Sequence, residues 1–185
     1  MFVLGIVGRA NAGKSTVSKA VLKEATAKGL TAEVFELSNY VLKEATGLAI
    51  LPPKSRAELI PSEIEELVKL GTQRREENPT HWIELLLQDI ESKKPDVAIC
   101  PSIRFLNEAI AIRELGGKII RIKSYVVDGV EWIARDRDAN HPSEVEHHSI
   151  HADYFLTDIR GESFLLGKQA ATLFNYLLER QISVQ

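Results

Sequence analysis

Four residues near the start of the chain have the types and the spacing that bind polyphosphates. Gly8, Gly13, Lys14 and Ser15 fit the pattern G-x-x-x-x-G-K-[ST], the phosphate-binding P-loop. Small residues let backbone N–H groups converge on a phosphate, and the N-terminus of a following helix adds partial positive charge. Lys14 is expected to reach the terminal phosphates, and the Ser15 hydroxyl to hold Mg²⁺. The pattern predicts a nucleoside triphosphate site made by Gly8, Asn11, Ala12, Gly13, Lys14, Ser15 and Thr16.

Arginines on other segments could neutralise a second phosphate. Arg104 follows a predicted strand and is the best candidate, because ligands bind at the carboxyl ends of parallel strands. Arg74 and Arg75 lie late in a predicted helix, where neighbours point about 100° apart, so at most one faces a given site. Arg135 and Arg137 belong to a charged segment further along. Weak surface pairing with nearby Glu and Asp is the alternative for these residues.

The histidines His147, His148 and His151 raise the question of a metal site, since residues four apart share one face of a helix. No cysteine lies near them, and no carboxylate at a ligand spacing completes a set of three or four groups. Solvent-exposed histidines at the border of a loop are therefore the favoured interpretation.

The elements that must position these groups alternate between strand and helix. The apolar run Phe2 to Val7 predicts a strand buried on both faces, and apolar positions from Ser15 to Lys28 recur at helical spacing. Ser62 and Glu65 form a predicted capping box, and Trp82 is interpreted as a core residue. Further strands are predicted over 32–37, 96–100, 118–125 and 154–157, and further helices over 41–46, 62–77, 82–90, 105–115 and 164–180. Short connections between them predict right-handed parallel crossovers.

Residues 126–150 break this alternation. The stretch is charged, and a loop of this length in a small domain is usually functional and often a lid.

Composition limits the class of protein. The 185 residues suit one domain, and 23 basic against 26 acidic side chains indicate no broad cationic surface for nucleic acid or membrane. Cys100, the one cysteine, ends an apolar run and is expected to be packed rather than nucleophilic, in a reducing compartment. Without a leader segment or a membrane-spanning run, a soluble cytoplasmic protein is expected.

Several motifs follow one another along nearly the whole chain. They are Gly8 to Thr16, Leu42-Lys43-Glu44, Leu70-Gly71-Thr72 with the following arginines, Trp82, Arg104-Phe105-x-Asn107-Glu108-Ala109 closed by Gly116-Gly117, His141-x-Ser143-Glu144, and Asp153-Tyr154. Together they resemble the bacteriophage-type deoxynucleoside monophosphate kinases. The resemblance implies an α/β P-loop fold in one domain, residues 1–185, with a five-stranded parallel sheet flanked by helices. It also implies that ATP, with Mg²⁺, phosphorylates a deoxynucleoside monophosphate.

The resemblance further implies a helical monophosphate-binding region at about 38–95 and a lid at about 126–150. Combined with the arginine argument, it gives catalytic roles to Lys14, Arg104, Arg135 and Arg137. The substrate-binding candidates are Ser38, Lys43, Arg74, Arg75, Trp82, Arg104, Glu108, His141, Ser143 and Glu144. The partner would be a small nucleotide, in the host cytoplasm for a viral protein. The accepted base, the sugar and the oligomeric state, a homodimer included, are left open.

One position departs from the family pattern. An aspartate usually stands two residues before the arginine of R-F-x-N-E, and here that residue is Ser102. A neutral hydroxyl is a weaker ligand for Mg²⁺ than a carboxylate, so weaker metal binding is expected.

Two other functions compete with the kinase interpretation. The P-loop also resembles those of small GTPases, but the chain lacks the N-K-x-D motif for guanine. Asp158 to Gly161 imitates the D-x-x-G switch and is expected after the last strand, too far along to reach the γ-phosphate. A nucleotide-binding regulatory module with weakened catalysis is the second alternative, and Ser102 keeps it open.

Overall fold

A computed structural model of the chain describes residues 1–51, 56–126, 128–132, 142–160 and 162–182. Its contacts divide the chain into two compact units, residues 1–34 with 94–185, and residues 35–93. The second unit covers nearly the same stretch as the predicted monophosphate-binding region, whose role stays a prediction.

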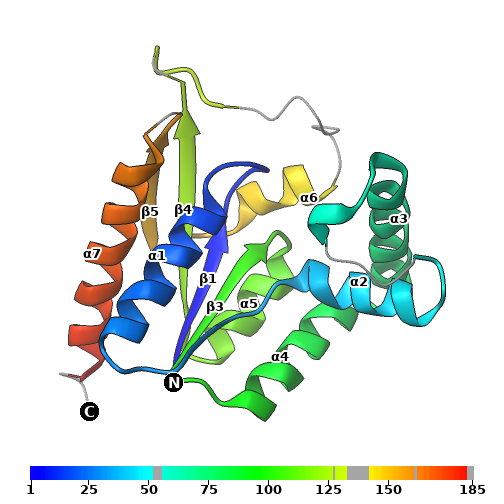
Figure 1. Cartoon of the computed structure of the whole chain (residues 1–185), viewed down its shortest axis with the longest axis horizontal. Coiled ribbons are helices and arrows are strands. Elements are labelled where there is room, and N and C mark those ends of the chain that lie inside the picture. The colour runs from blue at the N-terminus through cyan, green and yellow to red at the C-terminus, as the bar shows by residue number, and fades with distance from the viewer. Residues whose placement is uncertain (52–55, 127, 133–141, 161, 183–185) are drawn as a thin grey trace. The chain divides into compact units, whose positions relative to one another are not determined.

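The first unit contains a five-stranded parallel sheet with the strand order β2-β3-β1-β4-β5 (Figure 1). Its strands are β1 (Phe2–Val7), β2 (Ala32–Val34), β3 (Val97–Ile103), β4 (Lys118–Tyr125) and β5 (Tyr154–Ile159). Its helical segments are α1 (Lys14–Ala27), α5 (Leu106–Glu114), α6 (Pro142–Val145), the 3₁₀ turn η2 (Glu146–Ser149) and α7 (Ser163–Ile182). The predicted α/β class, with a five-stranded parallel sheet flanked by helices, is confirmed.

Helices cover both faces of this sheet. Leu4 and Ile6 of β1 pack in one core with residues of α1 and α7. Gly5 lies between them in sequence, and a Cβ built on it would meet Ile112 of α5. Because successive strand residues point to opposite faces, α5 covers the face away from α1 and α7. Every residue of β1 is buried, as predicted, so the strand carries its loop on a rigid base.

Three strand boundaries differ from the prediction. β2 ends at Val34 because helix α2 (Leu37–Gly47) starts where the strand was expected to end. β3 continues to Ile103, past Pro101, which has no N–H to donate. The proline is tolerated because β2 pairs only with Val97 to Ile99 and the register with β1 is irregular there. β5 runs two residues further than expected, to Ile159.

Cys100 lies in the buried part of β3, as predicted. Burial raises the pKa of its thiol to about 12, because the thiolate would be poorly solvated there. The side chain is therefore a packing residue and not a nucleophile.

The second unit is helical. It consists of α2, the short 3₁₀ segment η1 (Arg56–Glu58), α3 (Pro61–Glu77) and α4 (His81–Lys93). The predicted cap at Ser62 is wrong, because Pro61 already occupies the first helical position, where its missing N–H is no loss. The Glu63 carboxylate accepts the backbone N–H of Ile60 at 2.9 Å and closes this end.

Trp82 is in the core of the second unit. Its side chain is 1% exposed, and its indole N–H donates to the carbonyl of Gly71 at 3.0 Å, which joins α4 to α3. The structure confirms Trp82 as a core residue and leaves no exposed face for the substrate contact that the family resemblance implied.

We expect Trp82→Phe to lower the free energy of unfolding by about 2 kcal/mol, since it leaves the Gly71 carbonyl without its donor and opens a small cavity. Urea unfolding followed by circular dichroism measures the loss. Trp132→Phe is the matched control, because the Trp132 indole nitrogen has no hydrogen-bond partner among the described residues. An equal loss in both variants would contradict the assigned role of this hydrogen bond.

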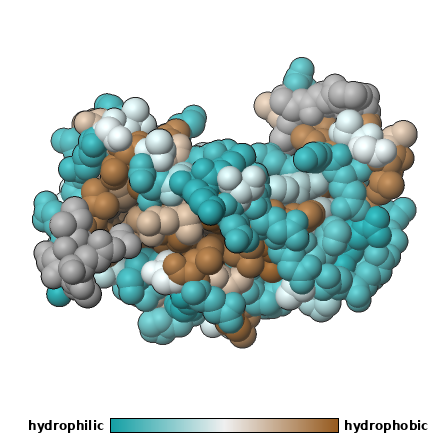
Figure 2. Space-filling view, turned by 90° about the horizontal axis from the view of Figure 1, so that it is seen from below, coloured by the Kyte–Doolittle hydropathy of each residue, from teal (hydrophilic) through white to brown (hydrophobic). Residues whose placement is uncertain are grey.

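Hydrophobic side chains also reach the surface. On the face seen in Figure 2 they appear at several places between hydrophilic ones, and scattered exposure of this kind is normal for folded proteins. Across the described segments, each helix is too short or too polar to cross a lipid bilayer.

Candidate functional site

The predicted P-loop connects the end of β1 to the start of α1. Gly13 precedes the first helical residue and has φ of 89°, in the left-handed region that favours glycine. A Cβ at this position would also clash with the Leu166 side chain of α7. The glycine is therefore required both by its backbone angle and by close packing, and α1 begins at Lys14 with its first N–H groups at the loop.

Lys14 is folded back onto its own loop. Its Nζ donates to the carbonyl of Gly8 at 2.8 Å and to that of Arg9 at 2.7 Å. Ser15, the predicted Mg²⁺ ligand, is exposed in the first turn of α1, and a hydroxyl there is an oxygen ligand of the type that Mg²⁺ accepts. The loop thus holds its cation and its hydroxyl on adjacent residues, as its pattern predicts.

Arg160 supports the same loop and was missed by the sequence reasoning. It follows β5 directly, and its Nη1 donates to the carbonyl of Asn11 at 2.9 Å. Asn11 has φ of 59°, which asparagine tolerates better than most residues. The Arg160 guanidinium also lies 4.2 Å from the centre of the Trp132 ring. Only its position after a sheet strand could have indicated this residue.

Arg104 and Glu144 meet at the P-loop. Arg104 is the residue after β3, and its Nη1 forms an ion pair with Oε1 of Glu144. The other carboxylate oxygen of Glu144 accepts the backbone N–H of Ala10 at 3.3 Å. Glu144 belongs to α6, which lies beside the loop between β1 and α1 (Figure 1). Three segments distant in sequence therefore bring a loop N–H, a carboxylate and a guanidinium together.

The Glu144 carboxyl is ionised in this setting. Burial alone would raise its pKa, but the Arg104 charge, the Ala10 N–H and the Lys14 charge together hold that pKa below its usual value. Glu144 is 6% exposed, so water screens these interactions little. The site contains a permanent negative charge at neutral pH.

Glu108 has a structural role instead of the predicted substrate contact. Its Oε2 accepts the backbone N–H groups of Arg104 at 2.8 Å and Phe105 at 3.2 Å, at the start of α5. At 2% exposure its side chain has no surface for a substrate. By holding the backbone of Arg104 in place, Glu108 fixes the point from which the Arg104 side chain extends.

The histidine prediction is wrong for one of its three residues. His148 and His151 are exposed, but His147 is 2% exposed. Arg121 of β4 donates to the carbonyls of His147, at 2.8 Å, and Ile150, and its Nη1 lies 3.4 Å from His147 Nδ1. An arginine between the buried Ile120 and Ile122 of β4 was the signal for this cluster. Among the described residues no group of three His, Cys, Asp or Glu side chains could hold a metal ion.

The pKa of His147 is lowered to about 4. Burial is the main cause, and the neighbouring charges of His148 and Arg121 add to it. Since Nδ1 faces the Arg121 donor, the neutral ring carries its proton on Nε2, an atom with no hydrogen-bond partner in the described part of the chain.

Asp158 lies closer to the P-loop than expected. It is inside β5 rather than after it, and its carboxylate accepts the Ser124 hydroxyl at 2.6 Å. Its Cγ is 3.9 Å from the position that a Cβ on Gly13 would take. The prediction that this residue follows the last strand is wrong, and Asp158 lies near Gly13 because β5 ends at the same edge of the sheet as β1. That it does not reach a γ-phosphate stays a prediction.

The arginines of the second unit contact groups on α2 and α3 of that same unit. Arg74 donates from Nε to Glu44 at 2.5 Å and from Nη1 to Glu77 at 2.7 Å, so it forms the surface pairs that were the alternative for it. Arg75 Nη1 donates to the Gly71 carbonyl at 3.1 Å. Both residues are partly exposed.

The other predicted residues of this unit are on α2. Ser38 is in the first turn of the helix and half-buried, and Lys43 is exposed on it. Ser38 was expected at a strand end, but the early start of α2 places it on a helix.

The predicted lid is only partly described. Arg135, Arg137 and His141 lie outside the described residues, and of Ser143 only its place in α6 is described. Within the described part of residues 126–150, Glu144 contacts Ala10 of the P-loop and His147 lies buried beside Arg121.

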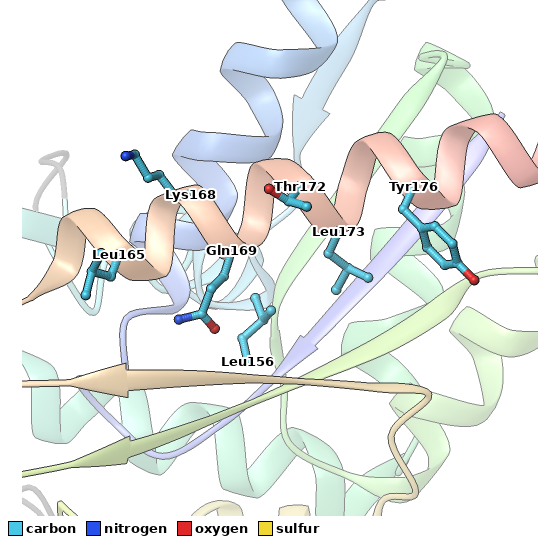
Figure 3. Close-up of a pocket in the computed structure, with 7 residues that line it drawn as sticks. All are labelled: Leu156, Leu165, Lys168, Gln169, Thr172, Leu173 and Tyr176. Atoms are coloured by element: carbon cyan, nitrogen blue, oxygen red, sulfur yellow. The ribbon is translucent and has the colours of Figure 1, made fainter.

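A separate groove runs between α7 and β5 (Figure 3). It is lined by Leu156, Leu165, Lys168, Gln169, Thr172, Leu173 and Tyr176. The Gln169 side-chain amide pairs with both backbone groups of Thr157, at 3.1 and 3.0 Å, and so covers the outer edge of β5. No P-loop residue lines the groove, so it is distinct from the candidate site.

The first unit is therefore an α/β unit with a P-loop between its first strand and first helix. No protein-family model matches the chain, and no curated protein sequence matches it. Among solved structures, it is similar to a mutant of the APS kinase of Mycobacterium tuberculosis, with 17% identity, 95% of each chain covered and a TM-score of 0.45. It is also similar to the shikimate kinase of Aquifex aeolicus, with 16% identity, 98% of each chain covered and a TM-score of 0.44. Both likenesses are too weak to assign an activity.

Proposed function

We propose that the protein transfers the γ-phosphate of ATP to the phosphate of a deoxynucleoside monophosphate, with Mg²⁺. The observation that carries this proposal is the Arg104 guanidinium, held at the P-loop by Glu144. A P-loop can bind one nucleotide without an arginine from another segment. Transfer of a phosphoryl group between two phosphates, in contrast, needs positive charge facing both phosphates. The resemblance along the sequence supports the deoxynucleotide as acceptor.

The reaction that this site supports is an in-line displacement. An oxygen of the acceptor phosphate attacks the γ-phosphorus, and the bond to the β-phosphate oxygen breaks, so ADP leaves. Lys14 would neutralise the terminal phosphates of ATP, and Arg104 the acceptor phosphate. Mg²⁺ would be held by the Ser15 hydroxyl and the phosphate oxygens, and would supply charge neutralisation between the β- and γ-phosphates. A phosphate acceptor has no proton to lose, so no general base is required.

ADP release with each common and modified deoxynucleoside monophosphate tests the proposal. We expect at least one of them to raise ADP production well above the rate with water alone. Hydrolysis of GTP without any acceptor would instead favour the GTPase. ATP binding without turnover for every acceptor would favour the regulatory module.

Ser102 lies half-buried in β3, two residues before Arg104. If it faces the metal, Ser102→Asp should lower the Mg²⁺ concentration for half-maximal activity by about tenfold, because a carboxylate is the stronger ligand. It should also raise the acceptor KM, since it adds negative charge near Arg104. A magnesium titration at fixed free ATP measures the first effect, with the exposed Ser92→Asp as the charge control. An unchanged midpoint would place Ser102 outside the metal site.

A further inference from the structure

Glu144 occupies groups that a phosphate is expected to use. One of its carboxylate oxygens accepts the Ala10 N–H of the P-loop, and the other forms an ion pair with the Arg104 guanidinium. A backbone N–H of a P-loop and a nearby arginine are the donors that hold the oxygens of a bound phosphate. A carboxylate presents oxygens of the same charge to these donors.

The surroundings of Glu144 attract anions. Lys14 of α1 and Arg104 after β3 both stabilise its negative charge. That charge in turn favours the protonated form of the nearby His147 and His148 rings on η2, although burial outweighs it there. At 6% exposure the carboxylate lies inside this group rather than at its border. Two anions cannot share one set of donors without strong repulsion in a site that water screens poorly.

We propose that Glu144 is an internal competitor for the nucleotide. Its carboxylate holds the Ala10 N–H and Arg104 before a nucleotide binds. The terminal phosphate of an incoming triphosphate takes the Ala10 N–H by displacing this carboxylate, which leaves Arg104 for the acceptor phosphate. This inference rests on the nucleotide site of the proposed function but not on the identity of the acceptor. Glu144 then keeps Arg104 at the loop before binding and releases it to phosphate afterwards.

Glu144→Gln tests the competition, because it removes the charge and keeps the shape of the side chain. The probes are inorganic triphosphate and a non-hydrolysable ATP analogue, each measured by calorimetry. We expect both to bind about tenfold more tightly to the variant, which corresponds to about 1.4 kcal/mol. Glu114→Gln is the control, since it removes the same charge from an exposed residue at the far end of α5, and its affinity should equal that of the wild type.

The sign of the change decides the result. If Glu144 stayed in place and helped to hold the nucleotide through Mg²⁺ or through Arg104, Glu144→Gln would weaken binding, and unchanged or weaker affinity overturns the proposal. Glu144→Ala, expected to bind at least as tightly, replaces the glutamine variant if that one fails to fold.

The two proposals can fail separately. If Glu144→Gln binds the probes more tightly but no acceptor supports turnover, the proposal for Glu144 is supported and the kinase proposal is wrong. Absence of triphosphate binding in the wild type and in every variant would overturn both.

Discussion

Lys14→Ala is expected to lower kcat by about two to three orders of magnitude while the fold stays intact. Removing one preorganised donor from a site of developing charge has effects of this size, because the interaction is strongest in the transition state. In the structure the Lys14 ammonium donates to the carbonyls of Gly8 and Arg9. Phosphate oxygens are stronger partners than neutral carbonyls, so the side chain is ready to turn to the γ-phosphate when it arrives.

The measurement is steady-state ADP production with the best acceptor, beside a thermal melt of each protein. Lys19→Ala is the control, because Lys19 is exposed on the same helix and outside the loop. A Lys14→Ala variant that keeps a tenth or more of the wild-type kcat would show that this loop does not hold the reacting phosphate.

The second large effect is a loss of stability in mild acid through His147. Its pKa is about 4 in the folded protein and about 6.5 in the unfolded chain, so between these values the unfolded chain binds the extra proton. The free energy of unfolding therefore falls as the pH falls from about 6.5 to about 4. The full shift corresponds to about 3 kcal/mol.

Unfolding curves at several pH values, for the wild type and for His147→Gln, isolate this contribution. The wild type should lose more stability than the variant over that pH range, because glutamine does not titrate. His151→Gln, which changes an exposed ring, should follow the wild type. Parallel curves for wild type and His147→Gln would mean that the ring is not kept neutral by burial beside Arg121.

The parts of the fold that the sequence predicted well have local causes. The strand Lys118–Tyr125 was placed at its observed bounds, and the P-loop was recognised from Gly8 to Thr16. Both depend on short-range patterns: a strand that starts directly after the glycine pair Gly116-Gly117, and glycines where the backbone must turn. The boundaries that were missed, at β2 and β3, depend on what neighbours them in space. β3 continues through Pro101 because β2 has already ended beside it and the register with β1 is irregular there.

The candidate site shows the same division. The sequence indicated Lys14, Arg104 and Glu144 separately, the first from a motif, the second from a strand end and the third from a resemblance. It could not show that Glu144 binds Ala10, because the two are 134 residues apart. It also interpreted His147 as exposed, since nothing in the local pattern shows that Arg121 of β4 lies against it.

The sequence by itself thus determined the class of fold, the P-loop pattern and the candidate cations for a second phosphate, because periodicity and motif spacing are local properties of the chain. The tertiary structure alone decided which charges meet and in what state. It placed Glu144 on the donors of the P-loop, made Glu108 a support for the Arg104 backbone, and buried His147 as a neutral ring. The reason is physical, since burial and the charges brought by distant segments set the protonation state and the partners of each side chain.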